Sequence, residues 1–138
     1  MAKILRQYTI KKLRMPSEGD LEHDIEWICN SLGFVTARDQ DKTAYRILQA
    51  LIKAAENGKG LTSDQLTHYV KPTIGSVIYH LKKLMRAGLV VKLNSAYELR
   101  MNSLKKTIEE IEREMINVLK DITYISKQID VCVGLENR

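Results

Sequence analysis

The sequence predicts a mainly α fold of the α+β class, in which a winged helix-turn-helix domain with a two-stranded wing precedes a long C-terminal coiled-coil helix. Three observations predict it: two helical segments flank a proline-containing turn, two short strand-like runs follow the second helix, and an apolar heptad repeat fills the C-terminal segment. We therefore divide the chain into a basic arm with an amphipathic helix (1–38), the winged domain (39–100) and a dimerisation helix (101–138).

Composition limits the classes of protein that this chain can form. With 138 residues, 44% of them hydrophobic and 28% charged, it has the size of one globular domain with an extension. Apolar runs stay well short of the roughly 20 residues of a membrane span, and the N-terminus lacks the pattern of a secretory signal, so we expect a cytoplasmic protein. Cys29 and Cys132 lie outside any CxxC spacing, and we expect no disulfide framework, metal site or cofactor.

Positive charge is concentrated in two blocks of the chain. Residues 1–14 carry five basic groups and no acid, and residues 71–100 carry six basic groups against Glu98 alone. A polyanion partner would explain this distribution, and basic surface that only aids solubility is the alternative on charge alone. We expect the N-terminal arm either to follow a DNA groove or to clasp a second subunit.

The first predicted helix runs from Asp20 to Leu32. Its apolar residues recur at helical spacing, its first turn is acidic, Asp20 is suited to cap its N-terminus, and Gly33 is suited to end it. Two roles remain open for this helix around Trp27: it lines a small-molecule pocket between subunits, or it extends the core.

Two further helices precede the turn of the predicted helix-turn-helix. A continuous apolar face predicts a helix over 42–57, with Asp39 and Asp41 as candidate caps. The three-residue spacing from Thr62 to Gln65 fits a capping box, which predicts a short helix that runs to about Val70. Proline at position 72 should end that helix.

The third helix of the set and a hairpin follow the break. Apolar residues again keep a 3.6-residue period from Thr73 to Ala87, and Gly88 ends the pattern. The runs 89–93 and 96–99 predict two strands joined by a tight turn at Asn94 and Ser95. This order of elements is that of a winged helix-turn-helix.

In that layout the helix after the turn lies in the major groove with its first residues facing the bases. Gly75 and Ser76 would let the backbone approach DNA, and Tyr79 could reach a base or a phosphate. Ile74 either packs inward or contacts a thymine methyl, and His80 is expected to pack beside the core. An ordinary solvated helix face is the alternative. The predicted DNA contacts are Thr73, Ile74, Gly75, Ser76, Tyr79, Lys82, Lys83 and Arg86 on the helix, with Lys92, Asn94 and Arg100 on the wing.

The stretch TIGSVIYHLKKLMRAGLVVK, residues 73–92, resembles the recognition helix and first wing strand of the ArsR-like winged-helix regulators of bacteria and archaea. The likeness extends more loosely over 43–100. It implies a prokaryotic, archaeal regulator of transcription that binds double-stranded DNA as a homodimer at a near-palindromic site, with Ser76 and Tyr79 at base-contacting positions. The metal-sensing members carry paired cysteines on the helix before the turn, and residues 61–70 contain none, which argues against metal sensing.

The C-terminal segment carries an a/d heptad seam over about four heptads. A second copy of the chain is the simplest partner for such a narrow apolar stripe, although the helix could instead fold back on its own domain. The pattern leaves the strand orientation and the oligomer number open. The predicted dimerisation residues are Leu104, Ile108, Ile111, Met115, Val118, Ile122, Ile125 and Ile129, and Cys132 continues the seam.

Two other classes of function fit the sequence less well. A winged helix can also serve as a protein–protein adaptor of the transcription machinery, but the small and basic residues of the third helix favour DNA. We do not expect an enzyme, because His23, His68 and His80 are scattered and no glycine-rich phosphate loop occurs. The sequence assigns no small-molecule effector.

Overall fold

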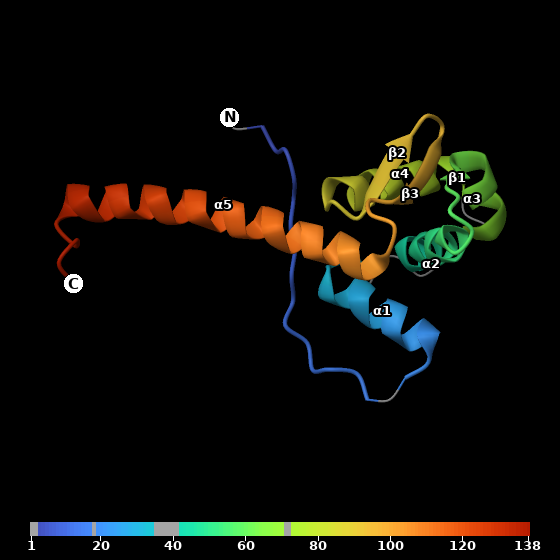
Figure 1. Cartoon of the computed structure of the whole chain (residues 1–138), viewed down its shortest axis with the longest axis horizontal. Coiled ribbons are helices and arrows are strands. Elements are labelled where there is room, and N and C mark those ends of the chain that lie inside the picture. Colours follow the sequence, from blue (N-terminus) through green and yellow to red (C-terminus); the bar gives the residue numbers. More distant parts are fainter. Residues whose placement is uncertain (1–2, 18, 35–41, 71–72) are drawn as a thin grey trace.

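The computed structural model describes residues 3–17, 19–34, 42–70 and 73–138. In these residues the chain forms a mixed α+β fold of helices and one small antiparallel sheet, from which the last helix projects (Figure 1). The elements are α1 (Leu21–Ser31), α2 (Thr43–Ala55), β1 (Leu61–Thr62), α3 (Ser63–Val70), α4 (Ile74–Arg86), β2 (Val90–Leu93), β3 (Ala96–Leu99) and α5 (Leu104–Val133).

Helix α1 begins and ends as predicted. The Asp20 carboxylate accepts a hydrogen bond from the His23 amide at 2.9 Å, and Gly33 ends the helix with a φ of +76°. Ile25 and Cys29 are buried against the core, so the helix extends that core. Burial raises the pKa of the Cys29 thiol to about 12, which keeps it protonated and unreactive at neutral pH.

The predicted capping box orders the start of the helix-turn-helix. The Gln65 amide donates to the Thr62 hydroxyl at 3.1 Å, and the Thr62 amide donates to the Gln65 side chain at 2.9 Å. Helix α2 starts after Lys42, which makes no side-chain capping bond. The candidate caps Asp39 and Asp41, and the predicted break at Lys71 and Pro72, lie outside the described residues.

The sheet has one strand more than predicted. Strands β2 and β3 form the expected hairpin, and Asn94 takes a φ of +59° at its tip. Strand β1, which precedes α3, pairs with the other edge of β3 to give the order β1-β3-β2. A two-residue strand is too short to show an alternating pattern, so the sequence did not predict it. Gly60 permits the close approach, because a Cβ there would lie 2.8 Å from the Tyr97 carbonyl oxygen.

One hydrophobic core holds α2, α3, α4 and the sheet together. Each of these elements contributes at least one almost fully buried apolar side chain, and burying one such chain stabilises the fold by about 1.5–3 kcal/mol. The fully buried set comprises Ile47, Leu48, Leu51, Leu66, Val70, Val77, Leu81, Leu84, Leu89 and Val90.

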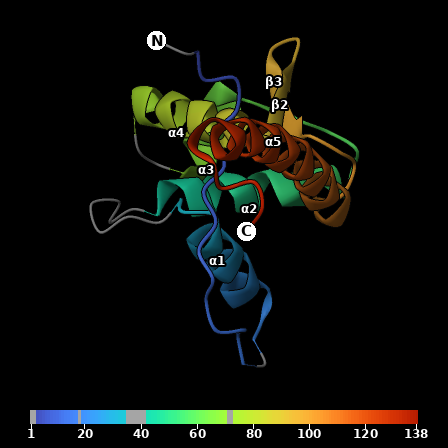
Figure 2. The ribbon, with the colours of Figure 1, turned by 90° about the vertical axis from the view of Figure 1, so that its left-hand side faces the viewer.

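Helix α5 is continuous over 30 residues, but its two ends have different surroundings. Ile111 is buried, and Leu104, Ile108 and Met115 pack partly buried against the core. The predicted seam is therefore split, because its first four residues are covered by their own domain. From Ile116 onwards every residue except Asp130 is exposed. Figure 1 shows this part of α5 leaving the domain, and Figure 2 views the helix from its free end.

The N-terminal arm packs on its own chain. The Gln7 amide donates to the Arg86 carbonyl at 3.0 Å, and the Lys11 amide donates to the Ser31 carbonyl at 2.7 Å. The Trp27 indole of α1 donates a hydrogen bond to the Arg14 carbonyl at 2.9 Å, which holds the end of the arm against α1. The arm thus links α1 to the C-terminal end of α4 and crosses α5 on the way (Figure 1).

One carboxylate joins the arm, the sheet and α5. Glu114 accepts hydrogen bonds from the Tyr8 hydroxyl at 2.7 Å and from the Arg6 guanidinium at 3.2 Å, and it forms an ion pair with Arg100 at the end of β3. Arg6 also donates to the Met85 carbonyl at 2.9 Å. The Arg100 hydrogen bond is the main reason that the pKa of Glu114 falls from 4.5 to about 2.

Replacing Glu114 should make stability depend less on pH. The pKa of Glu114 is lower in the folded chain than in the unfolded chain, so its ionised form stabilises the fold at neutral pH and this contribution is lost as the pH falls from 4.5 towards 2. We expect Glu114→Gln to lower the free energy of unfolding by about 1–3 kcal/mol at pH 7, and the difference from wild type to shrink by pH 3. Urea titrations followed by circular dichroism measure both values.

The matched control for this prediction is Glu112→Gln, because Glu112 lies exposed on the same helix. Its free energy of unfolding should differ from wild type by less than about 0.5 kcal/mol. A Glu114→Gln effect of the same size at pH 3 as at pH 7 would contradict the role given to the ionised carboxylate.

Candidate nucleic-acid interface

Helix α4 has one buried face and one open face. Val77, Leu81 and Leu84 are fully buried, which fixes how the helix rotates about its axis. The open face then follows from helical geometry. The predicted contact residues on it are exposed at Thr73, Ile74, Gly75, Tyr79, Lys82 and Arg86 and half-buried at Ser76 and Lys83.

The first turn of α4 is shaped for close approach. The Thr73 hydroxyl accepts a hydrogen bond from the Ser76 amide at 3.3 Å, which caps the helix. A Cβ at Gly75 would meet nothing nearer than the Thr73 hydroxyl at 3.9 Å, so packing within the chain does not require glycine there. Ile74 is 45% exposed and does not pack inward. The first turn therefore presents backbone, a small hydroxyl and an apolar group to the outside.

Tyr79 is exposed but held in place. Its side chain is 59% exposed, and the Lys83 ammonium lies 5.5 Å from the centre of its ring. The His80 ring packs edge-on against it, with the two ring centres 5.2 Å apart. A cation–π contact at an exposed site contributes about 0.5–1 kcal/mol. His80 is half-buried. These contacts restrict the ring and leave its hydroxyl available to a partner.

The wing offers fewer contacts than predicted. Lys92 and Asn94 are exposed near the hairpin tip, with the Lys92 ammonium 5.5 Å from the centre of the Tyr97 ring. Arg100 differs from the prediction, because its side chain is only 18% exposed and is ion-paired with Glu114 and, at 4.0 Å, with Glu110. These two glutamates lie one turn apart on α5, 10 and 14 residues after Arg100 and in a different element, so the helix and strand patterns did not indicate the pairing. Leu93, which we did not predict as a contact, is 54% exposed beside the tip.

The open face of α4 and the wing carries uncompensated positive charge. Within the described part of the chain, no ion pair neutralises Lys82, Lys83, Arg86 or Lys92. Exposed cations of this kind bind phosphate oxygens, and they do so without selecting a base sequence.

Across residues 3–17, 19–34, 42–70 and 73–138, no group of three histidine, cysteine or acidic side chains is placed to hold a metal ion. Among the described helices, none combines the length and the apolar character needed to cross a membrane.

Comparison with known proteins agrees with this geometry. The family model for the B-block binding subunit of TFIIIC matches residues 41–111, slightly more than half of the chain. The match covers α2 to β3 and the first turns of α5 as far as Ile111. Searches of curated proteins and of solved structures found no match. The chain therefore belongs to the family of the B-block binding subunit of TFIIIC, which has a winged-helix-like DNA-binding domain.

Proposed function

We propose that this protein is a sequence-specific regulator of transcription, not an enzyme, and that it binds double-stranded DNA as a homodimer. The observation that carries the proposal is the open first turn of α4, next to cations that form no ion pair among the described residues, in a family of DNA-binding domains. The resemblance of residues 73–92 to the recognition helix and first wing strand of the ArsR-like regulators supports a regulator of that kind in a bacterial or archaeal cytoplasm.

Each exposed group on α4 has a role in the proposed complex. The major groove, about 12 Å wide, admits one helix, and the N-terminal end of that helix faces the bases. Ser76 and Tyr79 then read base edges, and Ile74 contacts a thymine methyl. Lys82 and Arg86, further along the helix, bind phosphates. Lys92 and Asn94 bring the wing to the neighbouring backbone or minor groove.

The free end of α5 supports a dimer. Val118, Ile122, Ile125 and Ile129 keep the heptad spacing and are 41–56% exposed, and no part of their own described chain covers them. Leu119, at an e position, is 57% exposed and widens the stripe. A second α5 in a coiled coil would bury this apolar surface. Two-fold symmetry would then place the two α4 helices about 34 Å apart, or a multiple of it, on a near-palindromic site.

The first test is selection of bound sequences from random duplex DNA. We expect wild type to enrich a near-palindromic site, and Ser76→Glu to abolish binding, because a carboxylate would face the bases and phosphates. Lys82→Ala should weaken binding and reduce the slope of log affinity against log salt by about 1. Failure of the wild type to enrich any sequence would contradict the proposal.

Gly75→Ala should separate binding from folding. The added methyl group has open space within the chain, so we expect the free energy of unfolding to rise by up to about 0.5–1 kcal/mol from better helix propensity. The same methyl group would hold the backbone away from DNA, and affinity for the selected duplex should fall at least about tenfold. Thermal unfolding and fluorescence anisotropy measure the two effects. Unchanged duplex affinity would show that Gly75 does not approach DNA.

The double variant Ile122→Lys, Ile125→Lys should be monomeric in analytical ultracentrifugation, because four buried charges in the coiled coil, two from each helix, would cost several kcal/mol. Tyr124→Lys is the control, since Tyr124 is 63% exposed but lies off the seam. A dimer that persists in the double variant would exclude the seam as the interface. Oxidation of wild type also reports the orientation, because Cys132 residues at d positions meet only in a parallel pair.

A further inference from the structure

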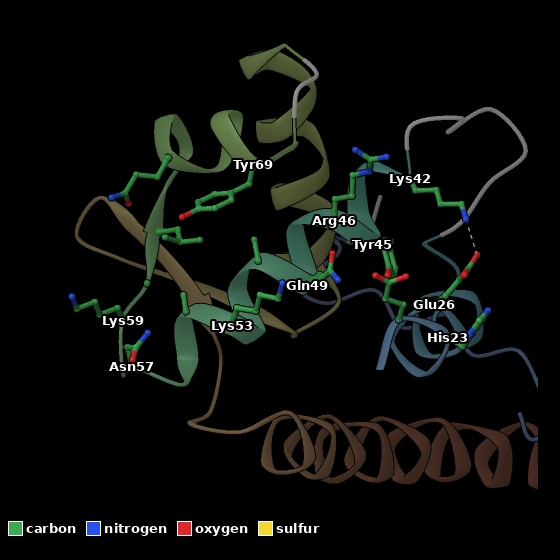
Figure 3. Close-up of a pocket in the computed structure, with 16 residues that line it drawn as sticks. His23, Glu26, Lys42, Tyr45, Arg46, Gln49, Lys53, Asn57, Lys59 and Tyr69 are labelled. Atoms are coloured by element: carbon green, nitrogen blue, oxygen red, sulfur yellow. Dashed lines mark hydrogen bonds and ion pairs between the residues drawn. The ribbon is translucent and has the colours of Figure 1, made fainter. Parts of the chain in front are cut away.

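A groove of about 700 Å³ lies apart from the contact face of α4. It is lined by residues of α1, α2, β1 and α3 and of the segment before β1, and by no residue of α4, β2 or β3 (Figure 3). Its volume falls within the range of small-ligand sites, about 300–1,000 Å³. Tyr45, Ala50 and Leu61 of the lining pack against the core, and the polar and exposed residues of the lining are available for a role other than folding.

Cations follow the groove along one face of α2. Arg46 and Lys53 lie seven residues apart on that face, about 10 Å along the helix axis, and Lys59 follows before β1. Among the residues that the structure describes, none of these three cations takes part in an ion pair. At the α1 end the charge is balanced, because Glu26 is paired with Lys42 at 3.0 Å. Glu22 also lines that end, so the uncompensated positive charge lies towards Lys53 and Lys59.

An aromatic ring and neutral amides complete the lining. Tyr69 is 65% exposed, and Figure 3 shows its ring extending from α3 over the groove. Gln49 and Asn57 line the side formed by α2 and the residues that follow it. An exposed ring can stack on a nucleobase, amides can hydrogen-bond its edge, and lysine and arginine can hold its phosphates.

We propose that this groove binds a phosphate-bearing nucleotide unit, with the base on Tyr69 and the phosphates at the end formed by Lys53 and Lys59. A single-stranded nucleic acid and a free nucleotide both offer this chemistry. An acidic peptide would satisfy the cations but would not use the exposed ring in this way. The groove would act independently of duplex binding by α4.

The test uses the full chain with three probes: a fluorescent oligothymidylate followed by anisotropy, ATP followed by calorimetry, and polyglutamate. We expect Lys53→Glu and Tyr69→Ala each to weaken binding of oligothymidylate or of ATP about tenfold, and Tyr69→Phe to retain it. Binding of the oligomer alone identifies a nucleic acid strand as the ligand, and binding of ATP identifies a free nucleotide. Both side chains are exposed, so the variants should fold, which circular dichroism checks.

Two controls separate this groove from the α4 face. Lys105→Glu makes the same charge change at an exposed position on α5 and should leave binding unchanged. Ser76→Glu should abolish duplex binding and leave groove binding intact, so failure of one proposal is distinguishable from failure of the other. The groove proposal is overturned if neither nucleotide probe binds, if Lys53→Glu behaves like Lys105→Glu, or if polyglutamate binds equally well and Tyr69→Ala has no effect.

Discussion

The way in which the N-terminal arm, the end of β3 and α5 meet depends on the ionised carboxylate of Glu114. It lies on the part of α5 that packs against the domain, and it receives Arg6 and Tyr8 from the arm and Arg100 from the end of β3. Arg6 adds a bond to the last turn of α4 through the Met85 carbonyl. Such partly buried charges are stable only when their partners are in place. Together with the apolar contacts of Ile111 and Met115 with the core, this carboxylate holds the packed part of α5 against the domain.

This constraint explains why the basic residues of the chain do not share one role. Arg6 and Arg100 belong to the two basic blocks of the sequence, yet both neutralise Glu114. Lys82, Lys83, Arg86 and Lys92 lie in the same second block and have no acidic partner in the described structure. Charge density along the sequence locates a basic region, but only the fold separates structural cations from those free to bind a phosphate.

Local signals in the sequence were sufficient to predict most of the helices and strands. The helices follow from apolar periodicity, and the capping box of Thr62 and Gln65 marked the start of α3 because both of its bonds lie within four residues. The third strand, the pairing of Arg100 and the covered start of the heptad seam all depend on contacts between distant segments. The open face of α4 follows from local periodicity, since the buried positions Val77, Leu81 and Leu84 determine it. The groove beside α2 left a trace in the spacing of Arg46 and Lys53, but charges on a helix face most often meet only solvent.

Helix α5 is packed on the domain as far as Met115 and free beyond it, so the free part acts as a rigid lever that pivots near Met115. Residues 116–133 span about 27 Å of helix at 1.5 Å per residue, and they extend beyond the packed domain. A small tilt at the packed end is therefore magnified at the far end. In the proposed dimer the separation of the two α4 helices would be governed by the stiffness of these levers. Tolerance for different half-site spacings would then be a mechanical property of α5 and would require no change in the residues that touch DNA.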